Sequence, residues 1–378
     1  MDNLPGAVPS EIHRLPKIDL HRHLLGSVRV ETLWELCQKY GVPSNLRSRG
    51  ALIEAIVHRK PVLDLGQYIN PWTVFRQLIR TPEEVCRIAR EAATDARRDG
   101  VTYVEFRVSL TGMELPHGGA PQAEIATDEY LDAIRQGFAQ ECSTVCRLVI
   151  SLPRHIVGPA KPVVIDAYTE KFFSTIEKFR DQFIVGVDLT GIETGWPASL
   201  FTNFFKRARA LAFPVTIHAG ETEGPQEIWT AIDELGATRI GHGTSAWADP
   251  SLVAALVKRG IALEVCPTTS RMLNNGKNGA THPIIESGLP IPYVICTDNP
   301  TVNDTTMSNE LWIAARMSQT PPEVFIQSQF ELARRAAFSP IVISATDDPC
   351  DDAELPGNGL GDARHAGNVP ARPRTWTN

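Results

Sequence analysis

The sequence predicts an α/β fold, a (β/α)8 TIM barrel with a helical insertion after its first strand. Three observations lead to this prediction. Short apolar segments recur eight times between residues 17 and 298, helical stretches lie between them, and polar side chains follow several of the apolar segments. Segments that are apolar throughout are typical of parallel strands that are buried on both faces.

The expected elements follow in chain order. The strands are residues 17–23, 101–109, 144–151, 183–191, 213–220, 238–243, 261–267 and 292–298. The clearest helical segments between them are residues 81–98 and 225–235. The first of these begins with Thr81, Pro82 and Glu84, which supply a helix cap, a first-turn proline and a capping-box acid. Gly100 follows its end, where helices often stop.

An insertion separates the first two strands. Residues 25–100 hold several helical stretches where most barrels have one helix, so we expect a lid over the pocket. Within it, Tyr68, Trp72 and Phe75 recur at near-helical spacing. This spacing favours aromatic packing of the insertion onto the barrel over stacking against a ligand.

Two regions of different composition divide the chain. We expect residues 1–343 to form the barrel with its lid as one domain. Residues 344–378 are rich in Pro, Gly, Asp and Ala and have little apolar periodicity, so we expect a disordered tail.

Charge and composition exclude several classes of protein. The 378 residues carry a formal net charge of −7, which argues against non-specific nucleic-acid binding. The N-terminus lacks an apolar signal core, and no apolar run is long enough to span a membrane. The seven cysteines are odd in number and form no CxxC pair, so we expect a reducing, cytoplasmic compartment. The oligomeric state is open.

Chemically reactive side chains gather at the expected carboxyl ends of four strands, where a barrel of this kind has its active site. They are His21 and His23 on the first strand, His218 and Glu221 after the fifth, His242 on the sixth, and Asp298 and Asn299 on the eighth. In an extended strand alternate side chains point the same way, so His21 and His23 project together. Each residue alone also fits a structural role, but recurrence at four strand ends favours a functional site.

Three histidines and one carboxylate are ligands that suit Zn²⁺ and leave room for a water molecule. Zinc lowers the pKa of such a water toward neutrality. The expected fourth strand contains no lysine that could bridge two metal ions, so a single metal is favoured.

The ordered motifs HxHLxGS, YVEFR, DLxGxE, HAGE, GHG, EVCP and TDN resemble those of the adenosine deaminase family of zinc hydrolases. The resemblance implies one zinc ion per chain with four ligands: His21, His23, His218 and Asp298. It implies that Glu221 is the proton donor and that His242 handles the attacking water, which Asp298 helps to orient. It also places His23, Gly191 and Asn299 at the purine substrate.

The implied function is hydrolytic deamination of adenosine, or of a closely related amino-purine nucleoside, to inosine and ammonia. Water attacks the ring carbon that bears the amino group, while Glu221 gives a proton to the adjacent ring nitrogen. Such a donor needs a raised pKa, as burial provides.

Two positions depart from the family. Leu25 stands where members that act on adenosine usually have an aspartate, which resembles a contact to the ribose 5′-hydroxyl; leucine cannot accept a hydrogen bond. If the chain stays extended past His23, Leu25 faces the pocket. Asn299 replaces a second aspartate, and its amide can donate to purine N7. The alternatives are therefore deamination of adenine or of an N6-substituted or 5′-modified adenosine, and more remotely a non-catalytic nucleoside-binding protein.

Overall fold

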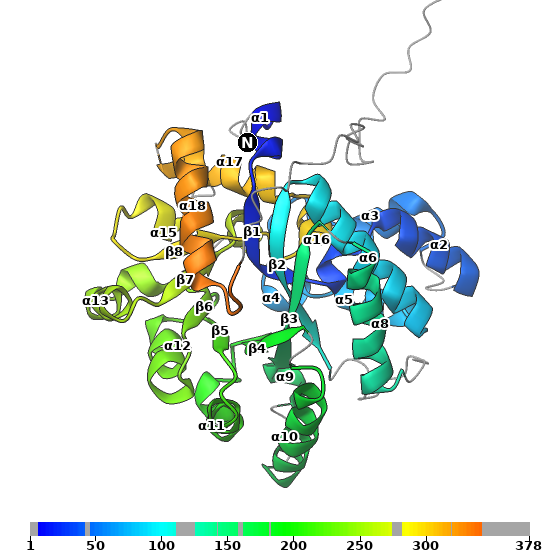
Figure 1. The fold of residues 1–378 in the computed structure, drawn as a ribbon, viewed down its shortest axis with the longest axis horizontal. Helices are drawn as coiled ribbons and strands as arrows, with labels where there is room; N and C mark the ends of the chain where they lie inside the picture. The colour runs from blue at the N-terminus through cyan, green and yellow to red at the C-terminus, as the bar shows by residue number, and fades with distance from the viewer. Residues whose placement is uncertain are drawn as a thin grey trace, which may run out of the picture. The chain divides into compact units, whose positions relative to one another are not determined.

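The computed structural model contains one eight-stranded parallel sheet in which every strand pairs with its neighbours in sequence (Figure 1). The strands are β1 (Lys17–His23), β2 (Val101–Ser109), β3 (Val145–Pro153), β4 (Ile184–Thr190), β5 (Val215–Ala219), β6 (Arg239–His242), β7 (Ala262–Val265) and β8 (Tyr293–Ile295). The structure describes residues 7–41, 46–110, 125–141, 143–157, 162–180, 183–273, 282–318 and 320–341. All eight predicted strands are confirmed, the first two residue for residue.

The sheet closes into a barrel at the carboxyl ends of its first and last strands. Arg22 forms an isolated parallel bridge with Asp298, which follows β8. The Asp298 amide donates to the His21 carbonyl at 2.8 Å, and the His23 amide donates to the Asp298 carbonyl at 2.7 Å. These bonds bring the first and eighth strand ends together, as the fold prediction requires.

Helices connect and surround the strands. Before and between β1 and β2 they are α1 (Ser10–Arg14), η1 (Leu25–Ser27), α2 (Val30–Tyr40), α3 (Arg49–Ile56), α4 (Leu65–Tyr68), α5 (Pro71–Leu78) and α6 (Pro82–Arg98). From β2 to β6 they are α8 (Thr127–Ala139), α9 (Arg154–Val157), α10 (Pro162–Glu177), η2 (Ala198–Phe201), α11 (Thr202–Ala210), α12 (Pro225–Thr230) and η3 (Ala231–Leu235). After β6 they are η4 (Ala246–Ala248), α13 (Pro250–Arg259), α14 (Pro267–Met272), α15 (Pro283–Glu286), α16 (Pro300–Asn303), α17 (Met307–Ser318) and α18 (Pro322–Ala336).

The predicted insertion is confirmed as a group of short helices between β1 and α6, and Figure 1 shows α2, α3 and α5 gathered on one side of the barrel. The helix that follows them begins at its predicted cap. The Thr81 hydroxyl accepts from the Glu84 amide at 3.3 Å, and the Thr81 amide donates to the Glu84 carboxylate at 3.2 Å. Gly100, which stands between this helix and β2, has φ +76°. A Cβ there would lie 2.6 Å from the His13 carbonyl oxygen.

The chain does not stay extended past His23. Leu24 has helical dihedral angles of −61° and −45°, and the 3₁₀ helix η1 begins at Leu25. The expectation that Leu25 continues the alternation of β1 is therefore wrong, because the strand ends before it. Leu25 is half-buried, and strand geometry no longer fixes the direction of its side chain.

Apolar side chains from the first and last strands pack against α18. Ile18, Leu20, Val294 and Cys296 are almost fully buried, and Phe330 of α18 packs against them. On β1 these apolar residues alternate with the two histidines, so they lie on the opposite face of the strand. In barrels of this class the functional site lies at the carboxyl ends of the strands.

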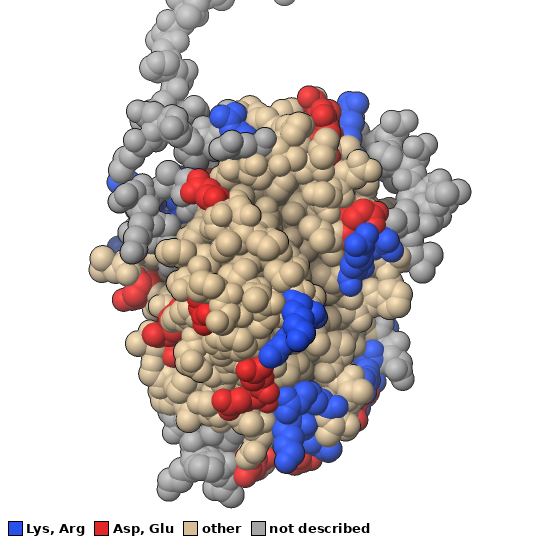
Figure 2. Space-filling view, turned by 90° about the vertical axis from the view of Figure 1, so that its left-hand side faces the viewer, with Lys and Arg blue, Asp and Glu red and all other residues tan. Residues whose placement is uncertain are grey.

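The visible surface carries charged side chains of both signs. In Figure 2, basic and acidic side chains lie close to one another on the visible face. Within the described residues, no helix is both long enough and apolar enough to cross a membrane. The predicted disordered tail, residues 344–378, lies outside the described residues and stays a prediction.

Candidate active site

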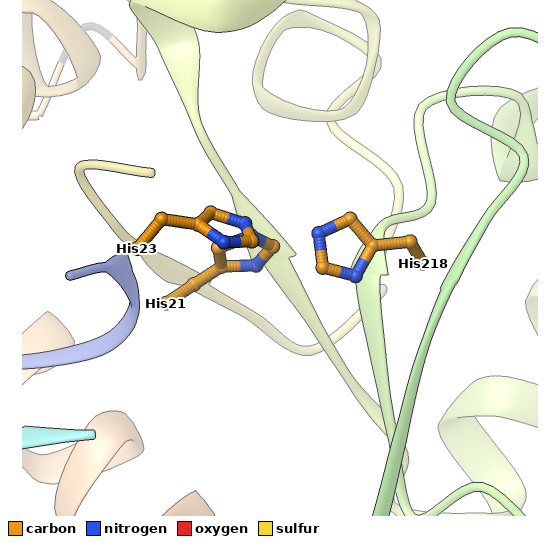
Figure 3. A group of neighbouring side chains, drawn as sticks. All are labelled: His21, His23 and His218. Atoms are coloured by element: carbon orange, nitrogen blue, oxygen red, sulfur yellow. The ribbon is translucent and has the colours of Figure 1, made fainter. Parts of the chain in front are cut away.

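Histidines from three strands converge at the carboxyl end of the barrel. The ring centroids of His21 and His218 lie 4.5 Å apart, and those of His21 and His242 lie 4.9 Å apart. Figure 3 shows the rings of His21 and His23 on one side and that of His218 on the other, directed toward one another. Nitrogen atoms of these three residues all lie within 4.8 Å of one another, close enough to share one metal ion.

His21 presents one free ring nitrogen to this centre. Its side chain is completely buried, and its Nδ1 lies 2.9 Å from Oε2 of Glu264. A carboxylate can only accept, so Nδ1 carries the hydrogen and Nε2 keeps a lone pair. Nε2 is buried and has no hydrogen-bond partner within the part of the chain that the structure describes. An unpaired buried nitrogen is costly unless something binds it, and a metal ion does so.

His218 is held in the same way on the opposite side. Its Nδ1 lies 3.1 Å from Oδ1 of Asp188, the strand neighbour on β4. Nδ1 therefore donates to a carboxylate, and Nε2 is free to act as a ligand. Carboxylate–histidine pairs of this kind orient the imidazoles that bind metal ions.

Buried arginines keep both supporting carboxylates charged. Arg107 donates to Asp188 at 2.8 Å and also to Glu264, and Arg239 donates to Glu264 at 2.7 Å. Burial alone would raise the pKa of Glu264, but the charges of Arg107 and Arg239 hold it well below its ordinary value. No role for these residues was predicted from the sequence, although Arg107, Asp188 and Glu264 belong to the motifs YVEFR, DLxGxE and EVCP.

Asp298 contributes a carboxylate to the same centre. Its Oδ1 lies 3.5 Å from Nε2 of His21 and 3.4 Å from Nε2 of His23. Its other oxygen, Oδ2, accepts from the Thr269 hydroxyl at 2.7 Å. The backbone of Asp298 is in the left-handed region at φ +59°, a strained conformation for a residue other than glycine. The bridge to β1 fixes this conformation and directs the carboxylate at the histidines.

Glu221 and His242 form an acid and imidazole pair beside these groups. Both are buried, and Oε1 of Glu221 lies 3.5 Å from Nε2 of His242. Burial, together with the charges of Asp298 and Glu193, raises the pKa of Glu221 well above its ordinary value. Burial lowers the pKa of His242 well below its ordinary value. The arrangement therefore favours a protonated carboxyl group next to a neutral imidazole.

Glu193 shapes the loop that carries Glu221. Its carboxylate accepts from the backbone amides of four consecutive residues, 220–223, at 2.7 to 3.1 Å. These bonds fix the turn after β5 and therefore the position of the Glu221 side chain. Glu193 is the final residue of the DLxGxE motif, and no role for it was predicted from the sequence.

The predicted substrate contacts lie at the same end of the barrel. Gly191 follows β4 at φ +89°, and a Cβ there would come within 2.4 Å of the His155 ring, so this position requires glycine. Asn299 is buried next to Asp298, and its Nδ2 donates to the Tyr68 hydroxyl at 3.1 Å. Among the described residues its Oδ1 has no hydrogen-bond partner. One of the two Nδ2 hydrogens of Asn299 is thus engaged by Tyr68, and the predicted bond to purine N7 would use the other.

Two aromatic residues of the insertion reach the site. The Tyr68 hydroxyl lies 3.3 Å from Oδ2 of Asp298. The Trp72 ring meets the His23 ring edge-on, with centroids 6.3 Å apart. Phe75 is fully buried, as expected for packing. The expectation that these aromatics serve mainly to pack the insertion is therefore incomplete, because Tyr68 makes a polar contact with the site.

The donor set fits a metal ion. It combines imidazoles whose other nitrogens are tied to carboxylates, one buried ring nitrogen without a partner, and a carboxylate oxygen between two histidines. Nitrogen and oxygen donors in this combination suit zinc.

A parallel eight-stranded barrel with such a cluster at its carboxyl end belongs to the class of metal-dependent barrel amidohydrolases. The sequence model of the adenosine deaminase family matches residues 16–340. The chain belongs to the adenosine deaminase family, as its motifs predict.

Three relatives illustrate this membership. Adenosine deaminase of Escherichia coli O1:K1 is 32% identical over 330 residues, which cover 86% of this chain and 94% of that protein. A Burkholderia ambifaria amidohydrolase with bound zinc is 26% identical with a TM-score of 0.75, covering 89% of this chain and 90% of that one. The Arabidopsis N6-mAMP deaminase is 25% identical with a TM-score of 0.72, covering 88% and 96%.

Proposed function

We propose that the protein hydrolytically deaminates adenosine, or a closely related amino-purine nucleoside, to inosine and ammonia. The observation that carries this proposal is the buried Glu221 carboxyl group, 3.5 Å from His242 and beside the histidine cluster. Hydrolytic removal of a ring amino group needs a proton donor for the ring and a group that handles water. The 32% identity to an adenosine deaminase supports this choice of reaction.

The proposed metal is one zinc ion per chain, with four ligands: His21, His23, His218 and Asp298. Bound there, zinc supplies a Lewis acid that makes water nucleophilic near neutral pH. Glu264 and Asp188 hold two of the imidazoles with Nε2 available, and Thr269 holds the outer oxygen of Asp298.

The chain's own residues then divide the proton transfers. Glu221 gives its proton to the ring nitrogen next to the attacked carbon, which weakens the aromatic resistance of the purine to addition of water. His242 and Asp298 orient the water and take its proton as the carbon–oxygen bond forms. The proton taken from the water passes to the amino group as the carbon–nitrogen bond breaks, so ammonia leaves. The remaining hydroxyl proton returns to Glu221 as the carbonyl forms. Gly191 and Asn299 contact the purine.

A substrate altered at its 5′ end is a second candidate, and Leu25 favours it. Leucine offers no acceptor to a ribose 5′-hydroxyl, and Leu25 is half-buried two residues after His23. A buried hydroxyl without a partner costs about 1–3 kcal/mol, whereas an apolar group at that place has no such cost.

Product formation by the zinc-loaded protein from a panel of substrates tests both candidates. The panel contains adenosine, 5′-deoxyadenosine, AMP, N6-methyl-AMP and adenine, with chromatography of the purine product because N6-methyl-AMP releases methylamine. Conversion of adenosine with the highest kcat/KM supports the first candidate. Preference for a 5′-altered compound supports the second. Tight binding of a nucleoside without any product would instead indicate a nucleoside-binding protein without catalytic activity.

A further inference from the structure

Tyr68, the last residue of α4, places its hydroxyl among polar side chains that lie far away in the sequence. The side chain is buried, at 2% relative exposure. The hydroxyl has four polar neighbours: Oδ2 of Asp298 at 3.3 Å, Oδ1 of Asn303 at 3.0 Å, Oγ1 of Thr269 at 3.2 Å and Nδ2 of Asn299 at 3.1 Å. A residue of the insertion thus meets the segments that follow β7 and β8.

The hydrogen bonds around this hydroxyl converge on one oxygen of Asp298. Thr269 donates its proton to Oδ2 of Asp298 at 2.7 Å and accepts from Nδ2 of Asn303 at 2.8 Å. Tyr68 is the second hydroxyl within reach of the same oxygen. The other oxygen, Oδ1, faces His21 and His23. Thr269 therefore holds Oδ2 of Asp298 outward, with Oδ1 turned toward the histidines. The single proton of the Tyr68 hydroxyl, shared between Oδ2 of Asp298 and Oδ1 of Asn303, adds a second contact.

The backbone near Tyr68 is fixed from both sides, so its hydroxyl has little freedom. The ring nitrogen Nε2 of His58 donates to the Tyr68 carbonyl at 2.9 Å, and the His58 amide donates to the Val302 carbonyl at 2.7 Å. The Val62 amide donates to the Met272 carbonyl at 2.8 Å. These bonds attach the segment before and within α4 to the loops that carry Thr269 and Asp298.

We propose that Tyr68 is a positioning residue for the Asp298 carboxylate, and that through it the insertion contributes to metal binding. The Tyr68 hydroxyl, with Thr269, keeps Oδ2 of Asp298 outward so that Oδ1 stays at the histidine cluster. This inference rests on the proposed role of Asp298 as a metal ligand. A partner that orients a ligand typically changes metal affinity or activity by about 10- to 100-fold when it is removed.

The test is Tyr68→Phe, which keeps the ring and removes only the hydroxyl. We expect zinc affinity, measured by competition with a chromophoric chelator, to fall about tenfold or more. We expect kcat to fall by a larger factor than KM changes, because the hydroxyl contacts the metal ligand directly and reaches the purine only through one hydrogen of Asn299. The matched control is Tyr40→Phe, which removes another hydroxyl–carboxylate bond of the insertion, the one to Glu84. This control should leave both quantities unchanged.

A double-mutant cycle shows whether Tyr68 acts through Asp298. In an Asp298→Ala background, Tyr68→Phe should have no further effect on zinc affinity. An equal loss in both backgrounds, or wild-type zinc affinity in Tyr68→Phe, would overturn the proposal. The melting temperatures of the metal-free proteins show whether each variant is folded. Each arm of the cycle compares two proteins that differ only by the Tyr68 hydroxyl. Zinc affinity is decisive even if the wild type deaminates no purine, so failure of the proposed function is distinguished from failure of this inference.

Discussion

The Nδ1 atom of His21 lies 2.9 Å from Oε2 of Glu264, while the opposite nitrogen of the same ring is buried and makes no hydrogen bond to any residue that the structure describes. Glu264 therefore decides which nitrogen of His21 has a lone pair for a metal ion. His21 and Glu264 are 243 residues apart in the chain and meet only because β1 and β7 belong to one barrel.

Replacing Glu264 with Gln should lower zinc affinity by about 10- to 100-fold. The neutral amide accepts a weaker hydrogen bond from His21 and leaves Arg107 and Arg239 without their shared negative charge. Chelator competition measures the loss. Glu35→Gln is the control, since Glu35 is a surface carboxylate paired with Arg87. Unchanged zinc affinity in Glu264→Gln would show that the His21 tautomer does not depend on this carboxylate.

Replacing Glu221 with Gln should reduce kcat by at least ~10²-fold, because the amide cannot deliver a proton to the purine ring. Zinc content should stay near that of the wild type, since Glu221 is not a proposed ligand. The control is Glu223→Gln, two residues further along, whose carboxylate bonds to the Thr194 hydroxyl. Normal turnover by Glu221→Gln, measured under saturating substrate, would remove Glu221 from the mechanism.

Replacing Leu25 with Asp should shift preference toward substrates with a free 5′-hydroxyl. A new acceptor for that hydroxyl is worth about 1–3 kcal/mol, or roughly 5- to 150-fold in the ratio of kcat/KM for adenosine to that for 5′-deoxyadenosine. Because η1 and not the strand sets the direction of this side chain, Leu25→Asn is measured beside it as a neutral acceptor. If the ratio is the same in all three proteins, position 25 does not contact the sugar.

Replacing Glu310 with Gln should make stability less dependent on pH. Glu310 is buried beneath the loop after β7, where Thr268 and Thr305 donate to it, and burial raises its pKa to about 7. In the unfolded chain the pKa is about 4.3, so Glu310 stabilises the fold most at low pH. That contribution declines as the pH rises from about 4.3 to about 7, by about 4 kcal/mol in all.

Urea unfolding of wild type and Glu310→Gln at several pH values between 4 and 8 measures this effect. The stability of the wild type relative to the variant should fall as the pH rises and become level above pH 7. Glu323→Gln, at an exposed position of α18, is the control. A difference that stays constant with pH would mean that folding does not shift the pKa of Glu310.

Local patterns predicted the strands well because their apolar character is a property of consecutive residues. They also predicted the convergence of His21 and His23, since alternation holds as far as the strand does. The same rule gave the wrong geometry for Leu25, because the backbone turns helical at Leu24. A single helical residue is enough to break the alternation, and sequence spacing does not reveal it.

The residues whose roles were not predicted from the sequence were missed for a different reason. Tyr68 contacts Asp298 across 230 residues, and the aromatic spacing around it indicates a helix face but not its partner. Glu193 and Glu264 belong to the motifs DLxGxE and EVCP. Their roles depend on which backbone amides and histidine rings surround them in the folded protein. Strand-end positions pointed to the reacting groups, whereas the residues that orient those groups lie within strands and loops.

Turnover as a function of metal content is the most direct test of metal-dependent deamination at this site. Ammonia release from adenosine is measured on one preparation before chelation, after removal of the metal, and during titration with zinc. We expect activity to disappear with the metal and to return fully at one zinc per chain in the wild type, but not in His218→Ala. Undiminished ammonia release by the metal-free wild type would contradict the proposed function.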